Sequence, residues 1–157
     1  MKSISALLMT VLLVACGSSD SKTLIIDGHK AQGSGDSKTA EAKFDEALKG
    51  LKPGDPLYIE ARLGRIEALI AKDAKLAKDE FLALAASTDL VVERDFTFIG
   101  GQMVSAHKYL EALDLVHTGI QRAGGESPQL MVQIDRIKKE AAADSAVRNA
   151  LASLGYL

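Results

Sequence analysis

Residues 35–48, which read Gly-Asp-Ser-Lys-Thr-Ala-Glu-Ala-Lys-Phe-Asp-Glu-Ala-Leu, decide the fold of this chain. The apolar residues Ala40, Phe44 and Ala47 recur at spacings of four and three, which is typical of one buried helix face. Asp36 precedes this pattern, where a carboxylate can accept hydrogen bonds from the unpaired N–H groups of a first helical turn. The stretch therefore predicts a turn followed by an amphipathic helix.

The same apolar spacing continues along the chain, and turn residues such as Pro53-Gly54-Asp55-Pro56 separate the helical stretches. The residues at 23–26 alone, Thr-Leu-Ile-Ile, could also form a strand. Because the connections are short, neighbouring helices should be antiparallel. The sequence predicts an all-α fold with eight helices, at 21–32, 37–51, 56–71, 73–86, 89–106, 108–123, 128–142 and 145–154.

Three glycines, Gly28, Gly64 and Gly100, are spaced 36 residues apart. Each is followed after 12 or 13 residues by an alanine and, four residues later, by a larger apolar residue. These larger residues are Phe44, Phe81 and Val116, and we expect the two phenylalanine rings to be buried between one hairpin and the next. A period near 36 with helix-turn-helix content predicts about three stacked hairpins, with 127–157 as a degenerate capping pair. An irregular all-α bundle is the alternative.

At these positions the chain resembles tetratricopeptide repeats, whose pattern has a first-helix glycine, then alanine and an aromatic residue four positions later. Residues 35–48, 72–81 and 107–113 carry the resemblance. The chain departs from the pattern because the first-helix Trp and Tyr are absent, and because one extra residue lies between Gly64 and Ala77. The resemblance implies an α-solenoid that binds a protein or peptide partner.

The first sixteen residues read MKSISALLMTVLLVAC and are similar to a bacterial lipoprotein signal. Their apolar core, from Ile4 to Val14, is shorter than the roughly 20 residues that span a bilayer. The resemblance implies a signal peptide at 1–15, thioether lipidation and acylation (palmitate) at Cys16, a tether over 16–20 and a repeat domain over 21–157. An ordinary secretory signal or a buried N-terminal helix are the alternatives. Gly17, rather than Asp, after the cysteine favours the outer membrane.

The composition excludes several classes of function. With 19 basic and 21 acidic residues the chain has a net charge of −2, which excludes a strongly basic nucleic-acid surface. Its single cysteine excludes an intrachain disulfide framework and a multi-cysteine zinc site. The zincin, P-loop and nucleophile-elbow motifs do not occur in it. We therefore predict no catalytic residue, metal or cofactor, and a protein that is not an enzyme.

The resemblance also implies that the first helix of each hairpin lines a groove for the partner. With the register set by the three glycines, the expected groove-facing residues are Lys22, Ile25, His29, Gln32, Tyr58, Ala61, Arg65, Ala68, Arg94, Thr97, Gly101 and Val104. Lys22, Arg65 and Arg94 could meet an acidic stretch or a terminal carboxylate of a partner.

The expected function is a lipid-anchored interaction module, an adaptor or assembly factor of the bacterial cell envelope. The location that the signal implies is the outer membrane, with the repeats facing the periplasm. An envelope enzyme with an unrecognised cleft and a structural spacer without a specific ligand are the alternatives.

Overall fold

The computed structural model describes residues 20–157, and it folds them into helices and connections without a β-strand. The predicted all-α fold is confirmed. The eight helices of this part of the chain are α1 (Ser21–Gly33), α2 (Ser37–Leu48), α3 (Pro56–Leu69), α4 (Ala74–Ser87), α5 (Glu93–Ser105), α6 (Tyr109–Arg122), α7 (Pro128–Glu140) and α8 (Ser145–Ser153). The predicted signal peptide, Cys16 and most of the predicted tether lie outside the described residues.

Side-chain caps start most of these helices where the sequence predicts them. The carboxylate of Asp36 accepts a hydrogen bond from the Thr39 N–H at 3.0 Å, and that of Asp55 accepts one from the Leu57 N–H at 2.8 Å. The Ser127 hydroxyl accepts one from the Leu130 N–H at 3.1 Å. Each cap satisfies a backbone donor that has no partner within its helix, and so fixes the start of the helix.

Helix α5 starts later than predicted, at Glu93 rather than at residue 89. The Asp95 carboxylate accepts a hydrogen bond from the Val92 N–H at 3.0 Å. Asp95, rather than Asp89, therefore fixes the start of this helix. Val91 is buried in the connection, whereas Leu90 is exposed. Residues 23–26 are helical, within α1, rather than a strand.

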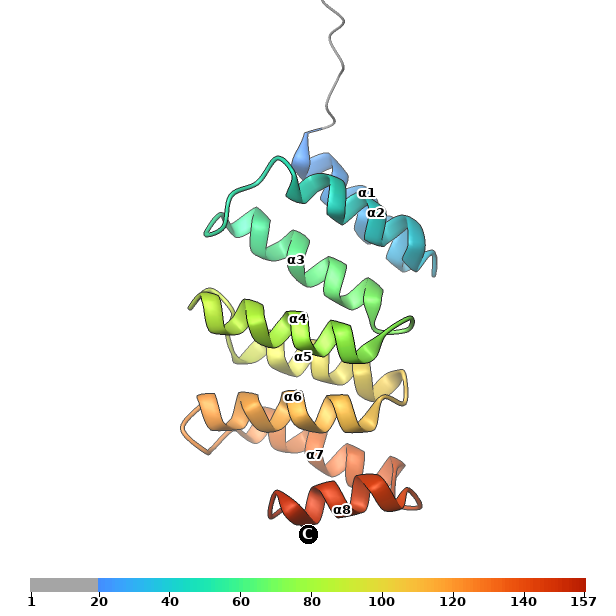
Figure 1. Ribbon diagram of the computed structural model, residues 1–157, viewed down its shortest axis with the longest axis vertical. Helices are drawn as coiled ribbons and strands as arrows, with labels where there is room; N and C mark the ends of the chain where they lie inside the picture. Colours follow the sequence, from blue (N-terminus) through green and yellow to red (C-terminus); the bar gives the residue numbers. More distant parts are fainter. Residues whose placement is uncertain (1–19) are drawn as a thin grey trace, which may run out of the picture.

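The helices form a stack of antiparallel hairpins in two layers, as Figure 1 shows. Helices α2, α4, α6 and α8 lie in front in this view, and α1, α5 and α7 lie behind them. Within the layers α1 contacts α3, α5 contacts α7, α4 contacts α6 and α6 contacts α8. The stack runs along the longest axis of the molecule from α1 to α8.

The first hairpin joins the stack through the ring of Phe44, which is fully buried, as predicted. A Cβ atom placed on Gly28 of α1 would lie 2.8 Å from this ring, and one placed on Gly64 of α3 would lie closer still. The ring therefore fits between two helices only because both lack a side chain where they meet it. We call this arrangement of Phe44, Gly28 and Gly64 the Phe44 junction.

Helices α3 to α8 share a second, larger core. Phe81 is fully buried, again as predicted, and its ring packs edge-on against that of Phe96, with centroids 4.8 Å apart. Gly100 faces Val116 of its own hairpin, whose Cγ2 atom would lie 2.7 Å from an added Cβ. Gly64 instead faces Phe44 of the preceding hairpin, so the three equally spaced glycines do not have equal surroundings.

Candidate binding site

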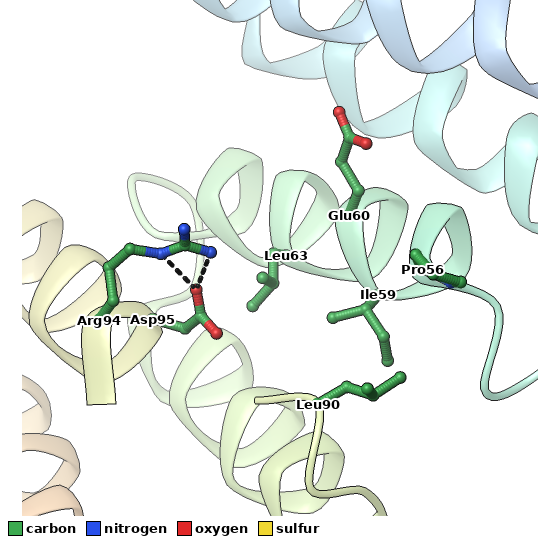
Figure 2. Close-up of a pocket in the computed structure, with 7 residues that line it drawn as sticks. All are labelled: Pro56, Ile59, Glu60, Leu63, Leu90, Arg94 and Asp95. Carbon is green, nitrogen blue, oxygen red and sulfur yellow. Dashed lines mark hydrogen bonds and ion pairs between the residues drawn. The ribbon is translucent and has the colours of Figure 1, made fainter. Parts of the chain in front are cut away.

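A hollow of about 360 Å³ lies between α3 and the start of α5. Figure 2 shows the side chains of Ile59, Leu63 and Leu90 directed into it, with Pro56 at one end. Leu90 is 47% exposed, although it is a large apolar side chain. The late start of α5 creates this exposure, because it leaves Leu90 in the connection rather than on the buried face of a helix. We call this feature the α3–α5 hollow.

Two charged residues border the α3–α5 hollow. The Arg94 guanidinium donates to the Asp95 carboxylate at 3.2 and 3.4 Å, yet 84% of the Arg94 side chain remains exposed. Asp95 is buried and also holds the Val92 N–H, so it anchors the arginine at the mouth. Glu60 points toward the first hairpin (Figure 2), where it pairs with His29 at 3.5 Å. The hollow thus combines an apolar floor with a cation available at its rim.

A separate set of polar contacts, made by His29 and Gln32, connects α1 to α3. The Gln32 amide donates to the Gly64 carbonyl at 2.9 Å, and its oxygen lies 3.1 Å from Nδ1 of His29. Burial raises the pKa of the nearby Glu67 carboxyl, while the charge of His29 and a hydrogen bond from Gln32 act in the lowering direction. These contacts fix the two predicted residues His29 and Gln32 beside each other on α1.

The other predicted groove residues are dispersed. Lys22 is exposed near the start of α1, and Tyr58 is half-buried against the larger core. The Thr97 hydroxyl donates to the Glu93 carbonyl of its own helix at 3.1 Å. Of the predicted set, only Arg94 lines the α3–α5 hollow. The structure therefore brings His29 and Gln32 together, and places Arg94 separately on α5.

Arg65 lies against the second helices of two hairpins. Its guanidinium donates to Asp45 of α2 and to Glu80 of α4, at 2.5 Å each. Burial acts to lower the pKa of Arg65, but the hydrogen bonds to Glu80 and Asp45 outweigh burial and raise it. The guanidinium connects α2, α3 and α4 and is occupied by these two carboxylates.

Four residues expected on the groove are buried in the core instead, which corrects that part of the prediction. They are Ile25, Ala61, Ala68 and Val104, each at most 4% exposed. Glu60, Leu63 and Glu67 of α3, spaced three and four apart, are exposed or half-exposed instead. The register taken from Gly64 is wrong for α3 because this glycine faces Phe44 of the preceding hairpin.

The residues that form the α3–α5 hollow, apart from Arg94, were not expected from the sequence. Leu90 was assigned to a helix starting at residue 89, and Ile59 and Leu63 were not singled out. One signal was present: Asp95 follows Val92 by three residues, which is the spacing at which an acid holds the first backbone N–H of a helix. That spacing would have placed Leu90 in a connection.

Over residues 20–157, no helix has both the length and the apolar character needed to cross a membrane. Within the same range, His, Asp and Glu side chains nowhere gather in threes as a metal ion would need. Comparison with protein-family models, with curated proteins and with solved structures finds no match for this chain.

Proposed function

We propose that this protein is a lipid-anchored, tetratricopeptide-like interaction module that holds a protein or peptide partner at the bacterial cell envelope. The α3–α5 hollow is the observation that carries the proposal. It presents the exposed Leu90 and the half-exposed Leu63 beside Arg94, whose guanidinium donates to Asp95 through Nε and Nη2 while 84% of the side chain remains exposed. Apolar anchor pockets with a charged rim are typical of sites that receive one side chain of a partner.

The chemistry of the hollow suggests what it receives. An apolar side chain of the partner would contact Ile59, Leu63 and Leu90, and a carboxylate of the partner would pair with Arg94. The volume of about 360 Å³ suits one or two side chains rather than a folded domain. The proposed ligand is therefore a peptide segment with neighbouring apolar and acidic residues.

The proposed anchor rests on residues 13–16, Leu-Val-Ala-Cys, with the only cysteine of the chain at the last position. Lipidation there would attach several acyl chains, which hold a protein at a membrane far more durably than one chain does. Gly17 favours the outer membrane, with the hairpins facing the periplasm. The test of this part is incorporation of labelled palmitate by the wild-type protein in a bacterial host and its loss in Cys16→Ser. Label that persists in this variant contradicts the anchor.

The binding function is tested by capturing partners from bacterial envelopes with the anchored wild-type protein and with a Leu63→Asp, Arg94→Glu variant. Leu76→Asp, Arg148→Glu is a matched control, since it changes an exposed leucine and an exposed arginine outside the hollow. The proposal expects one defined partner that the first variant loses and the control keeps. A partner that both variants keep excludes the hollow as the site, and no reproducible partner favours a spacer.

A further inference from the structure

The first hairpin begins very close, along the chain, to the proposed lipid anchor. Only five residue steps separate Cys16 from Ser21, the first residue of α1. One residue spans at most about 3.3–3.6 Å of extended chain, so α1 starts within about 18 Å of the lipidated cysteine. If Cys16 is at the bilayer surface, the start of α1 is near the lipid headgroups.

The end of α2 lies beside this starting point. The Ser21 hydroxyl donates to the Ala47 carbonyl at 3.2 Å, and a Cβ atom on Gly50 would lie 2.7 Å from the Ser21 oxygen. In Figure 1 the chain enters α1 at the same end of the hairpin as the connection from α2 to α3. Residues 21–22 and 49–52 therefore form one edge of the molecule, which we call the anchor edge.

The anchor edge carries three lysines, Lys22, Lys49 and Lys52, and all three are exposed. Within residues 20–157 none of them takes part in an ion pair. The second hairpin differs, because all five of its basic side chains are paired with a carboxylate: Arg62, Arg65, Lys72, Lys75 and Lys78. The three lysines of the anchor edge thus have no ionic partner among the described residues, whereas every basic residue of the second hairpin has one.

Carboxylates of α2 do not neutralise these lysines directly. Glu41 pairs with Lys72 at 3.2 Å and Asp45 with Arg65 at 2.5 Å, so both are directed toward the second hairpin. Three other carboxylates remain near the edge, those of Asp20, Glu46 and Asp55. The Asp55 carboxylate accepts from the Leu57 N–H. Lysine side chains are longer than these acidic ones, so the ammonium groups extend further from the backbone toward an approaching surface.

We propose that the anchor edge rests on a bilayer surface that contains anionic lipids, with Lys22, Lys49 and Lys52 contacting headgroup phosphates. This inference rests on the proposed lipidation of Cys16, and it adds a surface and a lipid chemistry to that proposal. Lipidation supplies the attachment, and the three lysines supply the orientation. Each lysine near an anionic surface contributes an attraction that weakens as salt screens it.

The test uses the lipidated protein reconstituted into two kinds of vesicle, phosphatidylcholine alone and phosphatidylcholine with phosphatidylglycerol. The protein's intact mass establishes lipidation first. An amine-reactive reagent then labels accessible lysines, and mass spectrometry gives the rate at each site. The reference is Lys139, an exposed lysine near the other end of the stack. The proposal expects labelling of Lys22, Lys49 and Lys52 to slow by about tenfold on anionic vesicles, an effect that added salt reverses.

Three outcomes overturn the inference in distinguishable ways. A mass without acyl chains contradicts the anchor itself, and with it the proposed function. Lipidated protein whose three lysines label at equal rates on both vesicles contradicts the anchor edge alone. If the three lysines label at equal rates on both kinds of vesicle but are protected in native envelopes, the anchor edge contacts an acidic protein rather than lipid.

Discussion

The first hairpin and the later helices bury their apolar side chains in different ways. The core that holds α1 and α2 against α3 has seven buried residues, of which four are alanines and one is Phe44. The core shared by α3 to α8 contains many large aliphatic side chains and two packed phenylalanines. Because alanine buries little area, the attachment of the first hairpin depends on few large side chains, chiefly Phe44 together with Leu24 and Ile25. The comparison shows that similar hairpins of one fold can be held in place by very different numbers of large buried side chains.

The largest effect is expected from Phe44→Ala. The ring is fully buried between α1 and α3, so its removal should lower the free energy of unfolding by about 3–5 kcal/mol. Hydrogen exchange should accelerate mainly in α1 and α2, because the larger core does not include Phe44. Val116→Ala, at the equivalent position of the third hairpin, is the control and should cost less. Equal acceleration in all helices would show that the two cores unfold as one unit.

Two glycine substitutions should have opposite signs. Gly64→Ala places a Cβ against the Phe44 ring, and overpacking of this kind costs about 1–3 kcal/mol. Gly101→Ala places its Cβ 3.6 Å from the flexible Gln133 side chain, so the helix preference for alanine should raise stability by about 0.5–1 kcal/mol. Urea denaturation measures both. An unchanged free energy of unfolding in Gly64→Ala would mean that the Phe44 ring can shift to make room for the added methyl group.

The ion pairs that connect the hairpins should contribute less than the rings do. Arg65→Gln removes two carboxylate contacts from a side chain that is 20% exposed, and should cost about 1–2 kcal/mol. Lys75→Gln is the matched control, since its pair with Asp79 lies within one exposed helix and contributes at most about 0.5 kcal/mol. Thermal unfolding at low and high salt distinguishes the two. Equal effects would show that the Arg65 contacts do not hold α2 against α4.

The smallest effect is expected at Glu67, which faces α1 from α3. Burial raises the pKa of this carboxyl in the folded protein, so folding disfavours its charged form. That penalty is present above the raised pKa and disappears below the ordinary pKa of a glutamate. Glu67→Gln should therefore raise stability at pH 7, and the gain should fade as the pH falls through this interval. Denaturation at several pH values measures it, and a gain that grows on acidification would contradict the assignment.

Much of the fold follows from local signals in the sequence. Asp36 caps the helix that it was predicted to cap, and Asp55 and Ser127 cap the helices that were predicted to begin at residues 56 and 128, because capping depends only on neighbouring backbone groups. Phe44 and Phe81 are buried as predicted, Phe44 opposite Gly28 and Gly64 and Phe81 against the ring of Phe96. These features need no knowledge of how one hairpin is rotated against the next.

The candidate site depends on how one hairpin is rotated against the next. It was therefore harder to predict from the sequence than the fold was. Gly64 faces Phe44 of the preceding hairpin, whereas Gly100 faces Val116 of its own hairpin. Arg65, which was expected to face a partner in the groove, contacts Asp45 of α2 and Glu80 of α4 instead. The α3–α5 hollow forms between segments distant in sequence, where a pattern confined to one helix carries no information.

The Phe44 junction has a mechanical consequence. A pulling force applied at the N-terminal end of the chain enters through α1 and must cross this junction before it reaches the larger core. Since the smaller core holds mostly alanines, the first hairpin is expected to unfold at a lower force than the rest, leaving α3 to α8 assembled. Under tension at the N-terminal end, α1 and α2, about a quarter of the described helices, would unfold and extend, while the remaining helices stay folded.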